Sequence, residues 1–364
     1  MPRLCLLANA ASSHTEKWAE ELASRGWTVD IISFIPAQIS NVNIHVVPEL
    51  LGGKVDILLR IRWVLNKVKE LKPDILHAHY ATSFGFLGAL AEPRPLVISA
   101  WGSDVFAFPK SSLIHKYLLK WILKQADLLC STSKVMAKEM DKYIEPGRKI
   151  NVIPFGVDVE LFSPSQKPDT QRIQSIKMVE QPIVFGVAKY FQPVYGLDLL
   201  LKAFAKLIHE RNLEARLRIA GDGPERPRLE LLAERLKISD KVEWLGAIPN
   251  ALVATFYKTL DVVVVPSRQE SFGVTAVEGS ACGLPIIASR VGGLPEVVID
   301  KETGILIEPG NIEELTAAME YMMFNPIERQ QMGQSGRQLV LKHYNWKENV
   351  SQMEQVYLRA LNRA

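Results

Sequence analysis

The chain has 364 residues, of which 48% are hydrophobic and 23% are charged, and its formal net charge is +3. This composition is that of a globular protein with room for two cores, and the charge is too small to predict nucleic-acid binding. No apolar run reaches the roughly 18 residues that a membrane span needs, and the three cysteines stand far apart among apolar neighbours, so we expect no disulfide, no metal cluster and a cytoplasmic location.

The first half of the chain alternates short apolar runs with amphipathic stretches, which predicts strands and helices in turn. The first apolar run is short and ends at Asn9, so we expect a strand there and not the core of a signal peptide. The expected strands are Leu4–Ala8, Thr28–Ser33, Ile44–Val47, Ile75–His79, Leu96–Ala100, Leu128–Ser131 and Asn151–Ile153. The expected helices are His14–Arg25, Lys54–Leu71, Ser83–Ala91, Leu113–Gln125 and Lys134–Tyr143.

The second half repeats this rhythm after a polar, proline-containing stretch at 163–181 that lacks strand periodicity. The expected strands are Ile183–Val187, Arg216–Ala220, Val242–Leu245, Val262–Val265, Pro285–Ala288 and Gly304–Ile307. The expected helices are Leu197–Glu210, Pro224–Leu236, Ala251–Thr259, Gly273–Cys282, Ile312–Phe324, Pro326–His343 and Trp346–Leu361.

This alternation of strands and helices predicts an α/β protein of two doubly wound, Rossmann-like domains with parallel sheets. We place the first domain at 1–165, the second at 182–345, and a separate C-terminal helix at 346–364. Open α/β sheets bind ligands at the carboxyl ends of their strands. We therefore expect the two domains to face each other across a cleft.

The most informative segment is 266–285, with the sequence PSRQESFGVTAVEGSACGLP. It reads as a loop after a buried strand, followed by a helix that begins at Gly273 and Val274. The unpaired amides and positive dipole of a helix N-terminus bind phosphate. Glu278 lies one turn further on the same face, where its carboxylate can accept hydrogen bonds from a ribose diol, and Glu270 lies in the loop. The alternative is that both carboxylates are solvated and that Phe272 belongs to the core.

This segment resembles the E-x7-E signature of family 4 of the retaining GT-B glycosyltransferases, also called glycosyl transferases group 1. The resemblance covers nearly the whole chain and includes Pro154–Asp158 before the linker. It implies transfer of a sugar from a nucleotide-diphosphate sugar to a hydroxyl of a glycan, glycolipid or small molecule, as in cell-envelope polysaccharide synthesis. It also implies a last helix that crosses back to the first domain. The chain has no Asp-x-Asp motif, which agrees with metal-independent transfer without a cofactor.

In the second domain, the resemblance assigns a phosphate clamp to Lys189 and contacts with the donor sugar to Glu270. The family's second cation falls at Val194 or Tyr195, which carry no charge, and we consider Arg268 or Arg290 as substitutes. The remaining expected donor-binding residues lie in the loop and helix start after the fourth strand and in two glycine turns near the base. They are Ser271, Phe272, Gly273, Val274, Glu278, Gly221, Gly223, Gly246 and Arg268.

In the first domain, the resemblance points to the ends of three strands. His79 and Asp104 are counted with the catalytic residues, and Trp101, Ser103 and Ser12 with the acceptor side. Trp101 stands where relatives have a histidine that contacts the donor, so that role does not carry over, although an indole can stack on a sugar face. For His79 the alternative is simple packing, and for Ser12 it is the N-cap of the first helix.

Two rival functions stay open. Trp101 and Val194 favour a catalytically weak scaffold that binds nucleotide sugars or carbohydrates. A GT-B nucleotide-sugar epimerase would need acid and base groups flanking the sugar, and no convincing pair stands out in the sequence.

Two amphipathic basic helices, 50–72 and 110–124, suit contact with an anionic membrane. A solvated face above a core stripe is the simpler interpretation of both. Their cations are Lys54, Arg60, Arg62, Lys67, Lys69 and Lys72 in the first, and Lys110, Lys116, Lys120 and Lys124 in the second.

Overall fold

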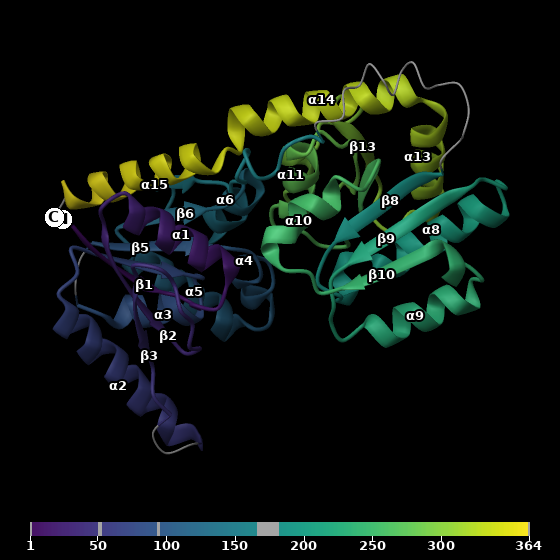
Figure 1. The fold of residues 1–364 in the computed structure, drawn as a ribbon. Helices are drawn as coiled ribbons and strands as arrows, with labels where there is room; N and C mark the ends of the chain where they lie inside the picture. The colour runs from purple at the N-terminus through teal and green to yellow at the C-terminus, as the bar shows by residue number, and fades with distance from the viewer. Residues whose placement is uncertain (1, 50–52, 93–94, 166–181, 363–364) are drawn as a thin grey trace. The chain divides into compact units, whose positions relative to one another are not determined.

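The computed structural model describes residues 2–49, 53–92, 95–165 and 182–362. The chain forms two compact units (Figure 1). Unit 1 comprises Met1–Pro154 and Lys347–Ala364, and unit 2 comprises Phe155–Trp346. Unit 2 thus begins before the predicted boundary at 165, because Phe155 and Phe162 pack against the unit 2 rings of Phe272 and Tyr257. Most of the predicted linker, 166–181, lies outside the described residues.

Unit 1 is built on a seven-stranded parallel sheet with the order β3-β2-β1-β4-β5-β6-β7. Most of its central strands are buried along their length, which explains why they are continuous apolar runs. The order reverses between β1 and β4, so the loops after these strands flank the switch point of the sheet. The strands are β1 (Arg3–Leu7), β2 (Thr28–Ser33), β3 (Asn43–Val46), β4 (Ile75–His79), β5 (Leu96–Ala100), β6 (Leu128–Ser131) and β7 (Ile150–Val152).

Helices cover both faces of this sheet. α2, α3 and α5 pack side by side on one face, and α1 and α15 cover the other (Figure 1). The helices are α1 (Ser13–Ser24), α2 (Gly53–Leu71), α3 (Ser83–Leu90), α4 (Ser103–Phe106), α5 (Leu113–Gln125), α6 (Lys134–Met140) and α15 (Trp346–Leu361). The short α4 was not predicted from the sequence.

The C-terminal helix α15 is joined to unit 1 by polar contacts that reach across almost the whole sequence. Arg25 donates to the Glu354 carboxylate and to the Ser351 hydroxyl, and the Trp27 indole donates to Glu354 over 3.0 Å. Tyr357 is fully buried beside Trp27, with 5.3 Å between ring centroids. The side chains on the buried side of the amphipathic helix α15 therefore pack against the rest of unit 1.

Unit 2 contains a six-stranded parallel sheet with the order β10-β9-β8-β11-β12-β13. Its switch point lies between β8 and β11. The strands are β8 (Ile183–Ala188), β9 (Ala215–Ala220), β10 (Val242–Gly246), β11 (Val262–Val265), β12 (Ile286–Ser289) and β13 (Gly304–Ile307). The helices are α8 (Leu197–His209), α9 (Arg226–Arg235), α10 (Asn250–Tyr257), α11 (Val274–Ala281), α12 (Leu294–Val297), α13 (Ile312–Phe324) and α14 (Pro326–His343).

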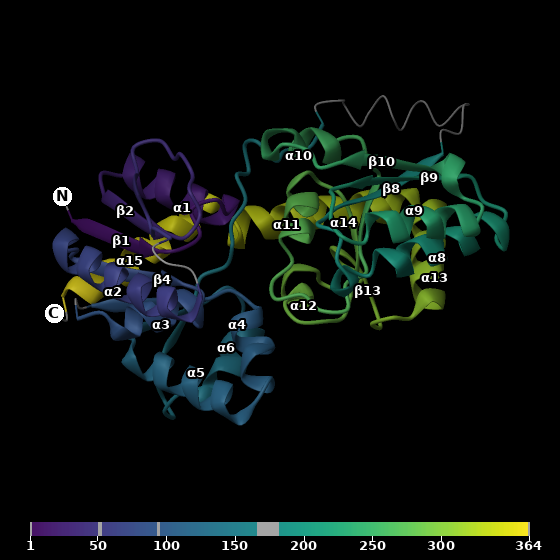
Figure 2. The ribbon, with the colours of Figure 1, turned by 90° about the horizontal axis from the view of Figure 1, so that it is seen from below.

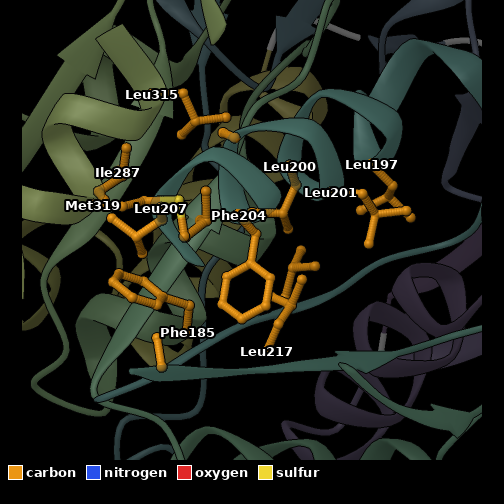
Figure 3. Packing of buried hydrophobic residues seen from close by; sticks show 14 of the residues in the cluster. Phe185, Leu197, Leu200, Leu201, Phe204, Leu207, Leu217, Ile287, Leu315 and Met319 are labelled. Atoms are coloured by element: carbon orange, nitrogen blue, oxygen red, sulfur yellow. The ribbon is translucent and has the colours of Figure 1, made fainter. Parts of the chain in front are cut away.

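The core of unit 2 forms around the apolar face of α8. Figure 3 shows Phe204 of this helix above Leu217 of β9, with Phe185 of β8 and Met319 of α13 beside it. Each of these four side chains is fully buried, and burying one such side chain stabilises the fold by about 1.5–3 kcal/mol. Packing on both faces of the sheet fixes the ends of β8 and β11, from which the candidate site extends. α10, α11 and α14 cover the opposite face (Figure 2).

Candidate functional site

The loop after β11 ends in the helix start that the sequence predicts. Gly273 has φ 108° and ψ 47°, a left-handed conformation that glycine adopts without strain. α11 begins at Val274, and its backbone ladder starts with the amides of Ala276 and Val277, which donate to the Gly273 carbonyl. The amides of Val274 and Thr275 precede this ladder and stand at the positive end of the helix dipole. This geometry suits an anion.

Lys189 and Glu270 form an ion pair beside this helix start. The Lys189 Nζ atom lies 2.7 Å from Glu270 Oε2, and the two side chains are only 13% and 10% exposed. Lys189 follows β8 and Glu270 follows β11, which are neighbouring strands at the switch point. The Tyr195 ring faces the same ammonium, with its centroid 4.3 Å away. Tyr195 is one of the two positions considered for the family's second cation, and it contacts Lys189 with an aromatic ring.

Arg268 is engaged in holding the Tyr195 loop. Its guanidinium donates to both oxygens of Asp198, each over 2.8 Å, and to the Pro193 carbonyl. Its amide donates to the Val194 carbonyl. Burial acts to raise the pKa of Asp198, but the hydrogen bonds and charge of Arg268, together with the charge of Lys202, outweigh burial and lower it. Arg268 therefore positions the loop that carries Tyr195.

Arg290 also has partners away from the site. Its guanidinium lies 2.9 Å from Asp300 and 3.3 Å from Glu308. Arg268 and Arg290 are the two substitutes considered from the sequence. In this geometry neither of them is placed as a second cation for the phosphates.

The glycine turn after β9 packs against the loop of Lys189. Gly221 has φ 130°, and a Cβ atom there would overlap the Lys189 carbonyl oxygen. Its amide donates to the Gly246 carbonyl over 2.7 Å, and the Lys189 amide donates to Ala220. A Cβ at Gly223 would meet the backbone of Phe191. These glycines therefore allow close packing of backbone on backbone at the edge of the site.

A second pair of glycines supports the Glu270 loop. A Cβ at Gly292 would overlap the Glu270 carbonyl oxygen, and one at Gly293 would meet Ser271 and Phe272. The Gly293 amide donates to the Glu270 carbonyl over 3.1 Å. The turn before α12 thus fixes the position of the loop that carries the first carboxylate of the motif.

The Phe272 side chain belongs to the core of unit 2, as the alternative interpretation of the motif has it. It is 2% exposed and lies against Phe155 and Tyr344, at centroid distances of 6.0 and 5.7 Å. Only its backbone remains available to a ligand, so its inclusion among donor-binding side chains is not supported by this geometry. Ser271, its neighbour, is half-buried.

Glu278 lies on α11 and accepts a hydrogen bond from Tyr257 over 3.1 Å. Tyr257 is fully buried, and burial, together with the charge of Glu278, raises the pKa of its phenol well above the usual value. The phenol therefore stays protonated and holds one carboxylate oxygen of the half-buried Glu278. Sequence reasoning missed Tyr257, because no motif marks a residue 21 positions earlier.

In unit 1, His79 and Trp101 lie at the ends of β4 and β5. Their rings are 4.6 Å apart between centroids and tilted by 36°. His79 is 4% exposed, and its Nδ1 atom has no hydrogen-bond partner among the described residues. Burial, with a smaller contribution from His14, lowers the pKa of His79 to about 3. The imidazole is therefore neutral at physiological pH.

His77 lies two residues before His79 in β4, and its ring makes hydrogen-bond contacts within unit 1. Its ring nitrogens lie 2.7 Å from the Tyr357 hydroxyl and 2.8 Å from the Ser99 hydroxyl. Burial lowers the pKa of His77 well below its ordinary value. Both histidines of the His-x-His pair are therefore neutral, and only His79 is beside Trp101.

Asp104 holds the loops after β4 and β5 together. Its buried carboxylate accepts hydrogen bonds from the amides of Ala81 and Gly102, each over 2.7 Å, and from the amide of Trp101. Burial raises its pKa, although these amides act in the opposite direction. The geometry favours a positioning role for Asp104 over the contact with reacting atoms expected from the sequence. Ser103, next to it, is exposed and its hydroxyl lies 2.9 Å from that of Tyr80.

Ser12 occupies the N-cap position of α1, with φ −80° and ψ 126°, but its side chain makes no capping hydrogen bond. Its carbonyl accepts from the Glu16 amide over 2.9 Å. The cap expected from the sequence is thus present in the backbone alone, and the half-buried Ser12 hydroxyl is left for other contacts.

Other features bear on ligands and membranes. In the part of the chain that the structure describes, no group of three or more acidic, histidine or cysteine side chains is arranged to hold a metal ion. No described helix is long and apolar enough to span a bilayer. The three cysteines are buried free thiols. A hollow of about 520 Å³, near Lys301, Tyr321 and Met332, contains none of the predicted site residues.

Comparisons with known proteins identify the family of the chain. The model of the glycosyl transferases group 1 family matches residues 169–339, and that of the glycosyl transferase 4-like family matches residues 3–133. The D-inositol 3-phosphate glycosyltransferase of Geodermatophilus obscurus is 30% identical over 322 residues, which cover 82% of this chain and 69% of the relative.

Two solved structures share the fold. Sucrose-phosphate synthase from Thermosynechococcus elongatus superposes with a TM-score of 0.83 at 23% identity and covers 100% of both chains. HepE of Anabaena, solved in complex with UDP-glucose, has a TM-score of 0.80 at 18% identity over 98% of this chain and 99% of that one. The fold is thus GT-B, as predicted, and the chain belongs to the glycosyl transferases group 1 family, the GT-B glycosyltransferases of family 4.

Proposed function

We propose that this glycosyltransferase moves a sugar from a nucleotide-diphosphate sugar to a hydroxyl acceptor, with retention of configuration and without a metal ion. The observation that carries the proposal is the start of α11. The amides of Val274 and Thr275 precede the helix ladder there, and the nearly buried ion pair of Lys189 and Glu270 lies beside them at the switch point of unit 2. Glu278 lies one turn further along the helix. The complex of HepE with UDP-glucose, a protein of the same fold, supports this class of donor.

In this proposal unit 2 binds the donor. The amides of Val274 and Thr275 and the Lys189 ammonium bind the diphosphate, and Glu278 accepts hydrogen bonds from the ribose. Glu270 orients hydroxyls of the transferred sugar. An ammonium has three donors, so Lys189 can keep its contact with Glu270 while it binds a phosphate oxygen. The glycine turns at Gly221, Gly223 and Gly246 lie beside Lys189 and border the space for the base.

The chemistry breaks the bond between the anomeric carbon and the diphosphate and forms one to the acceptor oxygen on the same face of the sugar. Negative charge grows on the departing diphosphate, where Lys189 and the helix dipole stabilise it. The acceptor proton passes to a leaving phosphate oxygen, so no protein base is required. His79, neutral because its pKa is about 3, would serve as a hydrogen-bond partner and not as a proton acceptor.

Unit 1 supplies the proposed acceptor-side groups. The Trp101 indole offers a flat apolar face to a sugar or a similar ring, and Ser12 and Ser103 offer hydroxyls. Asp104 holds the Trp101 loop in place through backbone hydrogen bonds. Free thiols suit a reducing compartment, and we place the reaction in the cytoplasm, with a glycan or glycolipid of the cell envelope as one class of acceptor.

A nucleotide-sugar-binding protein with weak catalysis is the second candidate. The observation that favours it is the uncharged ring of Tyr195 beside Lys189, because Val194 and Tyr195 are the two positions considered for the family's second cation. An epimerase is less well supported, because His79 is a poor acid or base and Asp104 is buried against backbone amides.

The test is release of nucleoside diphosphate by the purified chain. A thermal-shift screen of nucleotide sugars first identifies the donor, because a bound donor stabilises the fold. We expect diphosphate release to depend on an added acceptor, to continue in a metal chelator, and to give a product with the donor's anomeric configuration. Donor binding without acceptor-dependent release would favour the binding protein, and inverted product would reject retention.

A further inference from the structure

α5 exposes an apolar row on the surface of unit 1. Leu113, Ile114 and Tyr117 are 71%, 78% and 66% exposed, and Trp121 is 39% exposed. Their spacing places them on one side of the helix, and we call these four residues the α5 face. The opposite side, with Leu119, Ile122 and Leu123, is buried in the core of unit 1. Figure 2 shows α5 at the outer edge of that unit.

The lysines around the α5 face have few acidic neighbours. The chain has no acidic residue between Asp104 and Asp127. Lys110, Lys116 and Lys120 have no ion-pair partner within 4 Å among the residues that the structure describes, although the charge of Lys110 acts on Glu139. Lys124 lies 3.5 Å from Glu145, and both of these side chains are about 70% exposed, so this pair is screened by water and worth little.

The other basic helix, α2, differs in this respect. Arg60 pairs with Asp56 and Glu49. Lys67 pairs with Glu70, and Lys69 is 3.8 Å from Glu92. Ile57 and Leu58 are exposed there as well, but Arg60 and Lys67 are held in ion pairs on the helix itself, whereas the exposed pair of Lys69 and Glu92 adds little. The structure thus distinguishes α5 from α2, although both are basic amphipathic helices in the sequence.

We propose that the α5 face inserts into the headgroup region of an anionic lipid bilayer. Tyrosine and tryptophan side chains favour this interface, and lysines extend their ammonium groups to lipid phosphates while their stems cover apolar surface. A second copy of the chain docked through the same face would oppose lysines to lysines. A bilayer surface with negative charge complements both the apolar row and its rim.

The transferase reaction itself does not require contact of unit 1 with a membrane. The face lies on the helix that follows the loop of Trp101 and Ser103 in the sequence, so unit 1 would meet the membrane with the segment next to its proposed acceptor groups. The inference does not depend on transfer activity, because binding to vesicles is measured without donor or acceptor.

The experiment is sedimentation of the full chain with vesicles of phosphatidylcholine alone or with about one-third phosphatidylglycerol. We expect binding only to the anionic vesicles and weakening by salt. Lys116→Gln with Lys120→Gln should reduce the partition coefficient by roughly 30-fold, since each lysine near the surface contributes about one factor of five. Leu113→Ser with Ile114→Ser should reduce it by more than about tenfold.

The matched control is Ile57→Ser with Leu58→Ser on α2, which should bind like the wild type. An environment-sensitive dye on Tyr117→Cys reports insertion directly, because the three native thiols are buried. Equal binding to neutral and anionic vesicles, no binding, or loss of binding in the α2 control would overturn the proposal. So would a concentration-dependent dimer that the Leu113→Ser, Ile114→Ser variant abolishes, because the face would then contact protein.

Discussion

The ammonium of Lys189 lies 2.7 Å from the carboxylate of Glu270, although 81 positions separate the two residues in the sequence. The family resemblance gives them different parts of the donor, the phosphates and the sugar. In this structure they form one nearly buried pair, with the Tyr195 ring over the ammonium. Removing one partner therefore leaves a poorly solvated charge, so a variant's loss of activity can come from either binding or stability.

The first prediction separates these two effects at Lys189. Lys189→Met leaves Glu270 uncompensated and should lower the free energy of unfolding by roughly 3 kcal/mol. The double variant Lys189→Met, Glu270→Gln should recover most of that loss in urea denaturation. Turnover should stay low in both variants, because the phosphate cation is absent. Full turnover in the double variant would remove Lys189 from the phosphate site.

The second prediction concerns the ring of Tyr195. Tyr195→Phe retains the interaction with the Lys189 ammonium, and Tyr195→Leu removes it. Because a cation–π contact contributes about 0.5–2 kcal/mol, the leucine variant should lower kcat/KM by roughly 2- to 30-fold, and the phenylalanine variant should resemble the wild type. If phenylalanine is as harmful as leucine, the hydroxyl is the group that matters, as a donor to the diphosphate.

The third prediction tests Glu278 through the ribose. Glu278→Ala removes a charged acceptor, which is worth about 1.5–3 kcal/mol for each hydrogen bond, so nucleoside diphosphate should bind at least about tenfold more weakly by calorimetry. The same nucleotide without its ribose 2′-hydroxyl serves as the control ligand. Wild-type protein should distinguish the two nucleotides and the variant should not. Discrimination that survives in Glu278→Ala would move the ribose contact to another residue.

The fourth prediction is a pH dependence of unit 1 stability. The unfolded chain protonates His77 and His79 near the ordinary pKa of 6.5, whereas both pKa values are lower in the folded state, to about 3 for His79. The unfolded state therefore binds more protons below pH 6.5, and stability is lost as the pH falls. Between pH 7.5 and 5 His79 should account for roughly 2 kcal/mol, and His77 should act in the same direction.

The matched variant for this effect is His79→Phe, which keeps an aromatic ring beside Trp101 and removes one titrating group. Its free energy of unfolding should fall less steeply between pH 7.5 and 5 than that of the wild type. Identical slopes for both proteins would mean that His79 titrates normally in the folded chain and that water reaches its ring.

The sequence was sufficient for the features that depend on local pattern. Buried strands such as β11 are continuous apolar runs, and Gly273 marks the start of α11 because only a glycine takes that left-handed conformation without strain. The two carboxylates of the motif follow from their spacing on either side of this helix start. These local signals were enough to predict the fold and the position of the proposed phosphate site.

The remaining parts of the site depend on contacts between distant segments. Three sets of contacts each join distant segments of one unit. They are the bidentate pair of Arg268 with Asp198, the hydrogen bond from Tyr257 to Glu278, and the backbone hydrogen bonds to Asp104. A side chain's type does not reveal such partners. Arg268 and Asp104 therefore look like ligand-binding groups in the sequence, whereas the structure uses their charges to hold loops.

The joining of α15 to unit 1 bears on how the protein is made. The Tyr357 hydroxyl forms a hydrogen bond with the buried His77, and the Glu354 carboxylate accepts hydrogen bonds from Arg25 and Trp27. A ribosome makes α15 only after the whole of unit 2 has been synthesised. Unit 1 is therefore completed after unit 2, and until α15 is made one face of the unit 1 sheet lacks this helix and needs protection in the nascent chain.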